Sequence, residues 1–157
     1  MTSLRDKNPL LDRIVIEPMR ECDLDQVLAV EKASFRHPWS RAGFKAELHR
    51  ACAVSLVVRE KEEVLGYLVF WAIREEIHIL NLVLRSDRRR MGLGRFLLEY
   101  MFDWGRKRKL RRIFLEVRVF NLPARKLYEQ AGFIMTGRRK NYYAEDQEDA
   151  ILMARSL

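Results

Sequence analysis

The stretch IHILNLVLRSDRRRMGLGRFLLEYMFDWGRK, residues 77–107, holds the change of pattern that decides the fold. Its first eight positions, 77–84, form an apolar run that indicates a strand. A basic loop containing Gly92 and Gly94 follows. Beyond the loop, apolar residues recur at helical spacing to about Arg108, which indicates an amphipathic helix. We therefore expect a strand, a glycine-containing turn and a helix in direct succession.

The loop between this strand and helix has the composition of an anion site. Glycine lets a backbone approach a ligand closely and adopt unusual dihedral angles. The start of a helix offers N–H groups without an intrahelical partner and the positive end of the helix dipole. Arg89, Arg90 and Arg95 add cationic side chains. The loop thus predicts a phosphate site, with a plain structural turn as the alternative. It is neither a P-loop, which needs Gly-Lys-Ser/Thr, nor the dinucleotide fingerprint, which needs a third glycine.

The flanking segments predict a single mixed domain. We expect an α/β (α+β) fold, in which a largely antiparallel sheet of about seven strands carries helices on both faces. Ranges 54–58, 64–73 and 77–84 suggest an antiparallel meander. Asp23, Ser40 and Asn121 are the expected N-caps of three helices, the third of which Gly132 would end. The remaining expected strands are 14–16, 113–119 and two short closing strands, 133–135 and 150–153.

Length and composition agree with one globular domain. The chain has 157 residues, of which 48% are hydrophobic and 33% charged. We expect a ragged N-terminal segment over 1–12 and one domain over 13–157. No apolar run reaches the ~18 residues that a membrane helix needs, and the N-terminus lacks the core of a signal peptide. We therefore expect a cytoplasmic protein with no membrane partner.

The net charge indicates which partners the chain favours, and its cysteines and histidines indicate whether it binds a metal. The net charge of +8 favours anionic partners such as phosphates, nucleic acid or membrane surfaces. Cys22 and Cys52 form no C-x-x-C pair, and the three histidines show no metal-ligand spacing. We therefore expect no metal, and we interpret both cysteines as buried, hydrophobe-like thiols.

Several motifs together resemble one superfamily. Asn81-Leu82-Val83-Leu84, followed by Arg89-x-x-Gly92-x-Gly94 and a helix, is similar to the acetyl-CoA motif of the GNAT N-acetyltransferases. Further segments are similar to the RimI-type alanine acetyltransferases, a branch that acetylates the N-terminus of a small-subunit ribosomal protein. These segments are LEVR at 115–118 with Asn121, LYEQAGF at 127–133, HPWS at 37–40, RKNYY at 139–143 and EDAILM at 148–153. The resemblance covers about residues 14–154.

The resemblance implies a fold and a set of site residues. It implies four helices, a splayed central pair of strands, and acetyl-CoA as the co-substrate. Leu82 and Leu84, with Val83 between them, would offer backbone groups to the pantetheine arm. Asn121 would contact the coenzyme nearer its acyl end. Glu116 matches the general base of the family and Tyr128 its general acid. Backbone N–H groups would hold the pyrophosphate at Arg90, Met91, Gly92, Leu93, Gly94 and Arg95.

Elementary chemistry is consistent with these two acid–base roles. The attacking amine must lose a proton, and an N-terminal amine has a pKa of about 7.7–8.0 against about 10.4 for lysine. A carboxylate near the interior of a sheet, as we expect for Glu116, can have a raised pKa and act as base. A phenol such as that of Tyr128 can protonate a departing thiolate. The structural alternatives are a surface salt bridge from Glu116, for example to Arg118, and a core position for Tyr128.

The peptide site is predicted less directly. Trp39, Tyr142 and Tyr143 are candidates for lining a peptide groove, with core or edge-strand packing as the alternative. The acidic run 145–149, with Glu75 and Glu76, would present a negative surface to a basic substrate, unless it is only a solvated hairpin.

The sequence thus predicts transfer of acetyl from acetyl-CoA to a protein N-terminus, with the N-terminal alanine of a bacterial small-subunit ribosomal protein as the leading substrate. One alternative is a GNAT enzyme acting on a small-molecule amine or an internal lysine. A second is a non-catalytic basic protein that binds RNA or the ribosome. The basic runs would also hold an enzyme near ribosomes or other RNA.

Overall fold

The computed structural model describes residues 4–157 and contains one seven-stranded sheet. The strand order is β1-β2-β3-β4-β5-β7-β6, and every neighbouring pair is antiparallel except β4 and β5, which are parallel. The predicted mixed, largely antiparallel sheet is therefore confirmed. The strands are β1 Ile14–Pro18, β2 Ala53–Glu60, β3 Glu63–Ile73, β4 Glu76–Leu84, β5 Arg112–Arg118, β6 Ile134–Tyr143 and β7 Glu148–Ser156.

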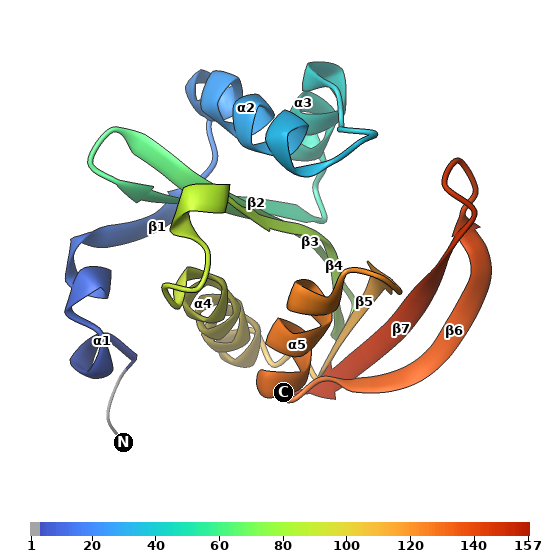
Figure 1. The fold of residues 1–157 in the computed structure, drawn as a ribbon. Coiled ribbons are helices and arrows are strands. Elements are labelled where there is room, and N and C mark those ends of the chain that lie inside the picture. The colour runs from blue at the N-terminus through green and yellow to red at the C-terminus, as the bar shows by residue number, and fades with distance from the viewer. Residues whose placement is uncertain (1–3) are drawn as a thin grey trace.

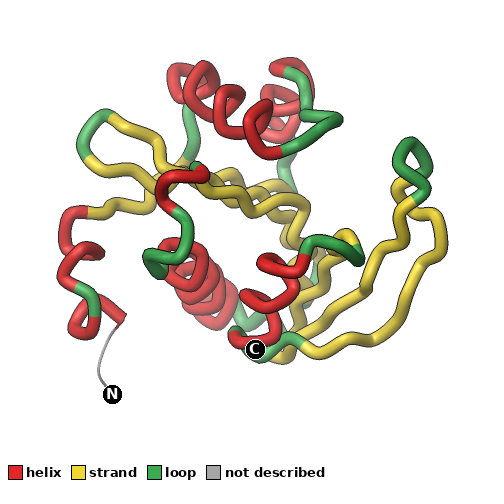
Figure 2. Tube along the Cα trace, viewed as in Figure 1, coloured by secondary structure: helices red, strands yellow, loops and turns green. Residues whose placement is uncertain are grey.

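Helices cover both faces of this sheet. Figure 1 shows α2 and α3 over one face and α4 and α5 over the other, and Figure 2 shows the N-terminal segment beside β1. The four predicted helices are present, and a short fifth, α1, precedes them. The α-helices are α1 Leu4–Lys7, α2 Leu24–Ser34, α3 Arg41–His49, α4 Leu93–Lys107 and α5 Leu122–Gln130. The 3-10 helices are η1 Pro9–Arg13, η2 Glu21–Asp23 and η3 Ser86–Arg88.

The described part of the N-terminal segment has regular structure. Residues 1–3 lie outside the described residues, and α1 and η1 occupy most of the rest of the expected ragged stretch. Leu11 of η1 is 2% exposed and belongs to the larger hydrophobic core. The Asn8 side-chain amide donates to the Met91 carbonyl oxygen at 2.9 Å, so this segment also contacts the glycine loop.

Three local predictions need correction. Asp23 does not cap α2 with its side chain, because that carboxylate accepts the Arg20 backbone N–H at 2.8 Å and a bond from the Arg59 guanidinium at 2.6 Å. The two closing strands are not short: β6 and β7 form a long hairpin. The thiols are not both buried, since Cys22 is exposed and Cys52 is half-buried. The Ser40 and Asn121 caps are confirmed, because their side-chain oxygens accept the backbone N–H groups of Gly43 and Ala124.

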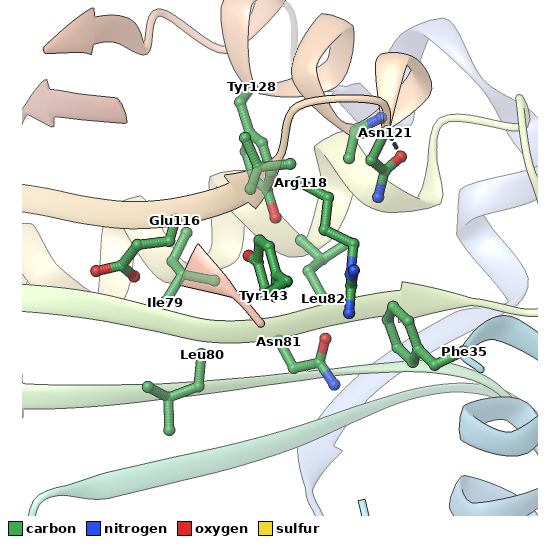
Figure 3. Close-up of a pocket in the computed structure, with 12 residues that line it drawn as sticks. Phe35, Ile79, Leu80, Asn81, Leu82, Glu116, Arg118, Asn121, Tyr128 and Tyr143 are labelled. Carbon is green, nitrogen blue, oxygen red and sulfur yellow. Dashed lines mark hydrogen bonds between the residues drawn. The ribbon is translucent and has the colours of Figure 1, made fainter. Parts of the chain in front are cut away.

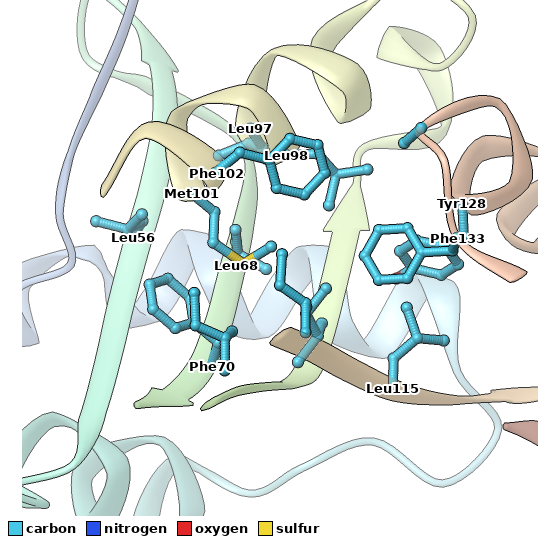
Figure 4. Close-up of a cluster of buried hydrophobic side chains, with 14 of the residues drawn as sticks. Leu56, Leu68, Phe70, Leu97, Leu98, Met101, Phe102, Leu115, Tyr128 and Phe133 are labelled. Carbon is cyan, nitrogen blue, oxygen red and sulfur yellow. The ribbon is translucent and has the colours of Figure 1, made fainter. Parts of the chain in front are cut away.

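Each face of the sheet has its own hydrophobic core. The larger core lies between the sheet and helices α4 and α5, and Figure 4 shows Leu97, Met101 and Phe102 of α4 in it. The smaller core lies under α2 and α3, where Phe44 meets Tyr67 edge to face at 5.4 Å. Both helical layers are thus anchored independently to a common sheet.

The central strands β4 and β5 part along their length. Their pairing runs from Glu76 opposite Arg112 to Ile79 opposite Leu115 and extends no further. A register shift between β3 and β4 leaves Leu80 without a partner. Beyond it, β4 pairs only with β3, and β5 pairs only with β7. The splayed strand pair that the resemblance implied is confirmed.

A buried carboxylate connects α2 to the strands beside this gap. Glu31 is 1% exposed, and its two oxygens accept the Trp39 backbone N–H at 3.0 Å, the Asn81 side-chain amide at 3.2 Å and the Tyr67 hydroxyl. Burial raises the pKa of Glu31 above its ordinary value of 4.5. One side chain thereby holds the loop after α2 against β3 and β4.

We expect Glu31→Ala to lower the free energy of unfolding by about 2–4 kcal/mol, because three buried donors lose their acceptor. A group with a raised folded pKa stabilises most below its ordinary value, here 4.5, and this contribution is lost as pH rises through the raised value. The deficit should therefore be larger at pH 4 than at pH 8 in urea unfolding. Lys32→Ala, an exposed neighbour on α2, is the control. Equal stability of the two variants would contradict this role.

Candidate active site

A cavity of about 100 Å³ lies in the gap between β4 and β5. Figure 3 shows side chains from both strands, α5 and β6 directed into this region. Five of the predicted site residues line it, and seven others complete the wall. The predicted five are Leu82, Glu116, Asn121, Tyr128 and Tyr143, and the others are Phe35, Ile79, Leu80, Asn81, Val117, Arg118 and Ala124.

Two candidate peptide residues lie outside the lining of this cavity. Trp39 packs against Phe44, with ring centroids 5.2 Å apart, at the edge of the smaller core. Tyr142 is 46% exposed and meets Tyr143 edge to face at 5.1 Å. Of the three aromatic candidates, the structure brings only Tyr143 into the cavity.

Tyr128 reaches the cavity from α5. The Asn121 cap begins this helix, and Tyr128 lies on its inner face with 6% exposure, its ring 5.5 Å from that of Phe133. Burial raises the pKa of the Tyr128 phenol well above its ordinary value of 10. The hydroxyl therefore stays protonated at neutral pH and is available as a proton donor.

Glu116 lines the cavity but differs from our expectation in its electrostatics. Its Oε2 atom lies 2.6 Å from the Nε2 atom of His78, a residue that our sequence reasoning did not select. This hydrogen bond lowers the pKa of Glu116 below 4.5 and raises that of His78 above 6.5. The predicted upward shift for Glu116 is therefore wrong, because the hydrogen bond with His78 outweighs burial. Its salt-bridge partner is also not Arg118.

Arg118 instead joins the cavity wall to the β6–β7 hairpin. Its guanidinium lies 2.9 Å from Asp146 and 3.2 Å from Glu148, and stacks 4.1 Å above the centre of the Tyr143 ring. Burial raises the pKa of Tyr143 to about 12, so this phenol is also neutral. Sequence reasoning missed Arg118, although it lies two positions after Glu116 and must share its face of the strand.

The acidic run 145–149 does not form the free negative surface that we considered. Asp146 also contacts His37 at 3.4 Å and Arg36 at 3.6 Å, and Asp149 pairs with Arg138 at 2.6 Å. The cations of the chain itself neutralise most of this run. The contacts also join the tip of the hairpin to the loop between α2 and α3.

The glycine loop has the backbone geometry of an anion cradle. Gly92 has φ +84° and precedes α4 without any side-chain cap, so the first N–H groups of α4 have no capping partner. Arg90 has φ +61°. A Cβ atom on Gly94 would lie 2.9 Å from Leu127, so this glycine allows α4 to approach α5 closely. These residues fit a coenzyme phosphate.

The three loop arginines differ in the partners of their side chains. The Arg95 guanidinium lies 2.6 Å from Glu99 and donates to the Gln130 carbonyl oxygen at 2.6 Å. It would have to leave these partners to make the expected contact with phosphate. Arg89 donates to Leu84 and Ser34, both at 3.4 Å. Within residues 4–157, Arg90 makes no hydrogen bond or ion pair. Arg90 is therefore the loop side chain best placed to meet an anion.

Residues 4–157 contain no group of three or more His, Cys, Asp or Glu side chains arranged to hold a metal ion. No helix in the described part of the chain combines the length and the apolar character needed to cross a bilayer.

A parted strand pair, with a glycine loop at the start of the following helix and a carboxylate and a phenol in the gap, is the arrangement of an acetyl-CoA-dependent transferase. Residues 24–133 match the acetyltransferase (GNAT) family, and the chain belongs to this family.

Several relatives are named for one activity. A protein of Bacillus subtilis (strain 168), provisionally named ribosomal protein bS18-alanine N-acetyltransferase, is 34% identical over 90% of this chain and 94% of its own. The ribosomal protein bS18-alanine N-acetyltransferase of Escherichia coli (strain K12) is 30% identical over 88% of this chain and 95% of its own.

Solved structures show the same architecture. The crystal structure of the ribosomal-protein-S18-alanine N-acetyltransferase from Escherichia coli has a TM-score of 0.83 at 30% identity, covering 91% of this chain and 93% of that one. Ard1 from Thermoplasma volcanium shares the fold, with a TM-score of 0.85 at 24% identity, covering 92% of this chain and 98% of its own.

We expect Gly92→Ala to weaken acetyl-CoA binding about 5- to 30-fold, because an L-residue in the left-handed conformation costs roughly 1–2 kcal/mol and relief of that strain would turn the loop N–H groups away. Gly132→Ala is the matched control, since Gly132 has φ +92° at the end of α5. Isothermal titration calorimetry should show near-normal affinity for the control. Normal affinity of Gly92→Ala would remove the loop from the coenzyme site.

Proposed function

We propose that this chain transfers the acetyl group of acetyl-CoA to the N-terminal α-amine of ribosomal protein bS18, whose first residue would be alanine. The observation that carries the proposal is the gap between β4 and β5, where Glu116 and Tyr128 line one small cavity. The names of the Bacillus subtilis and Escherichia coli relatives support the substrate. Acting on a ribosomal protein would place the reaction in the cytoplasm.

The proposed coenzyme site uses mainly the backbone. The N–H groups of residues 90–95 would hold the pyrophosphate, with Arg90 as the available cation. Leu82, Val83 and Leu84 lie on the part of β4 that β5 does not pair, so their strand edge is available to the pantetheine arm. The Asn121 side-chain oxygen caps α5 at 3.2 Å from Ala124, which leaves its amide group to contact the coenzyme.

The proposed reaction divides proton transfer between two side chains. Acetyl-CoA supplies the acetyl group as a thioester. Glu116 receives one proton from the cationic amine, and the nitrogen lone pair then bonds to the acetyl carbon. As the carbon–sulfur bond breaks, the Tyr128 phenol donates its proton to the sulfur. The second proton leaving the nitrogen restores the phenol, so each turnover yields an amide, a thiol and one released proton.

The cavity favours an N-terminal amine with a small first side chain. An α-amine with a pKa of about 7.7–8.0 is neutral far more often at pH 7 than a lysine amine at about 10.4. Phe35, Leu80 and Leu82 form apolar parts of the cavity wall, which suit the methyl group of a first alanine.

The basic surface is part of the same proposal. The net charge of +8 would repel a basic substrate tail at long range but would favour an RNA-rich particle that carries it. We therefore propose that the enzyme meets its substrate close to ribosomal RNA.

A panel of synthetic peptides tests the substrate. The peptides share one bS18-like sequence and begin with Ala, Ser, Leu or Lys, and a blocked peptide with an internal lysine and a polyamine complete the set. Mass spectrometry should find acetyl on the α-amine of the Ala peptide, with kcat/KM at least about tenfold above the Leu peptide, since one to two excess methylenes are already worth that much. Preference for the polyamine or the internal lysine would favour the corresponding alternative.

Tyr128→Phe tests the general acid. We expect kcat to fall about 10²–10⁴-fold with acetyl-CoA affinity unchanged, because only the donated proton is lost. Tyr100→Phe is the control, since Tyr100 is 39% exposed on α4 and does not line the cavity. Steady-state kinetics with the Ala peptide give the answer, and an unchanged kcat for Tyr128→Phe would exclude this role.

A further inference from the structure

His78 and Glu116 form a two-residue path out of the cavity. The His78 Nε2 atom lies 2.6 Å from the Glu116 Oε2 atom. Glu116 lines the cavity and its side chain is 21% exposed, whereas His78 does not line the cavity and its side chain is 40% exposed. The pair therefore leads from the enclosed site toward water.

The strand register explains why these side chains meet. His78 of β4 is opposite Phe114 of β5, and Glu116 follows two positions later on the same face of β5. The last paired residues, Ile79 and Leu115, lie directly beside this contact. The pair therefore sits where the strands part.

Glu116 alone is a poor acceptor for the proton of an N-terminal amine. Such an amine has a pKa of about 7.7–8.0, whereas a glutamate carboxyl ordinarily has a pKa of about 4.3, and that of Glu116 is not raised here. Transfer of the proton from the amine to Glu116 would be unfavourable by about three pKa units, or about 10³-fold. An imidazole, at an ordinary 6.5 and raised further here, closes most of that gap.

We propose that His78 is a positioning residue that takes the amine proton from Glu116 and passes it to solvent. The amine N–H bond breaks as a Glu116 O–H bond forms. That O–H bond then breaks as the Nε2 atom of His78, unprotonated in the neutral Nδ1–H tautomer, gains the proton, which leaves Glu116 anionic. The imidazolium then loses one ring proton to water, and proton exchange with solvent restores the neutral Nδ1–H tautomer. This path carries the one proton that each turnover releases, and it rests on the proposed function.

The charges around His78 come from several elements. Glu116 of β5 and Glu76 of β4 favour the imidazolium, and Arg139 of β6 opposes it. The β3 residue opposite His78 is Trp71, which is uncharged. Its indole N–H donates to Glu47 at 2.8 Å, and Arg50 stacks on it at 5.1 Å. The raised pKa thus reflects a dominant pairing with Glu116.

Chemical rescue with imidazole distinguishes a proton-transfer role of His78 from a purely structural one. His78→Ala should lower kcat with the Ala peptide at least about tenfold at pH 7, and added imidazole should restore part of the loss, since general acid–base steps contribute about 10²–10⁴-fold. The partly exposed site admits imidazole, and rescue should increase with the basicity of substituted imidazoles. His78→Gln, which keeps a hydrogen-bond donor but no titrating group, should lose the ascending limb of kcat/KM that lies above pH 6.5 in the wild type.

A second His–Glu contact supplies the control. His49 lies 3.3 Å from Glu21, and neither residue lines the cavity, so His49→Ala should keep wild-type kcat and show no response to imidazole. Circular dichroism checks that each variant is folded. A folded His78→Ala enzyme with kcat within twofold of the wild type, or with a loss that imidazole does not restore, would overturn the proposal.

NMR titration distinguishes this inference from the proposed function. In the wild type, the titration midpoint of His78 should lie above the ordinary imidazole value of 6.5, and Glu116→Gln should lower it. If no peptide amine is acetylated, the proposed function fails, and the titration still tests whether the two side chains are coupled. A His78 midpoint at or below 6.5, or one unchanged by Glu116→Gln, would show that they are not coupled and would overturn the relay.

Discussion

The parting of β4 from β5 after Ile79 and Leu115 is the constraint on which the rest of the structure depends. Two strands that stayed paired would use their facing backbone groups on each other and close the sheet. Here β4 remains with β3, past an unpaired Leu80, while β5 remains with β7. The parting opens a small polar cavity in the middle of an otherwise continuous hydrophobic sheet.

The surroundings of this gap are held by buried polar contacts that bridge distant segments. Glu31 attaches the loop after α2 to Tyr67 and Asn81 of the neighbouring strands. Across the cavity, Arg118 attaches the β6–β7 hairpin through Asp146 and Glu148. Because Glu31 and Tyr67 of the first network are buried, whereas the Arg118 and Asp146 side chains of the second are partly exposed, we expect the wall at α2 to be the more rigid side of the cavity.

Two neutral phenols and two ion-paired side chains, Glu116 and Arg118, line the cavity. Burial keeps the phenols of Tyr128 and Tyr143 protonated. Glu116 is also partly buried, yet its pKa moves the other way because His78 contacts it directly. A specific partner at 2.6 Å thus outweighs the general cost of burying a carboxylate.

Much of the fold and part of the candidate site follow from local signals in the sequence. Gly92 and Gly132 adopt the positive φ values that mark a loop and a helix end, and Ser40 and Asn121 cap the helices that they precede. Each of these depends only on neighbouring residues. The partners of Asp23, Glu31 and Glu116 do not: His78 and Glu116 are 38 positions apart, and only the register of two non-consecutive strands brings them together. The sequence by itself determined the elements, the glycine loop and the family. Only the tertiary structure decided which charges meet, because a pKa depends on contacts across the sheet that no local pattern specifies.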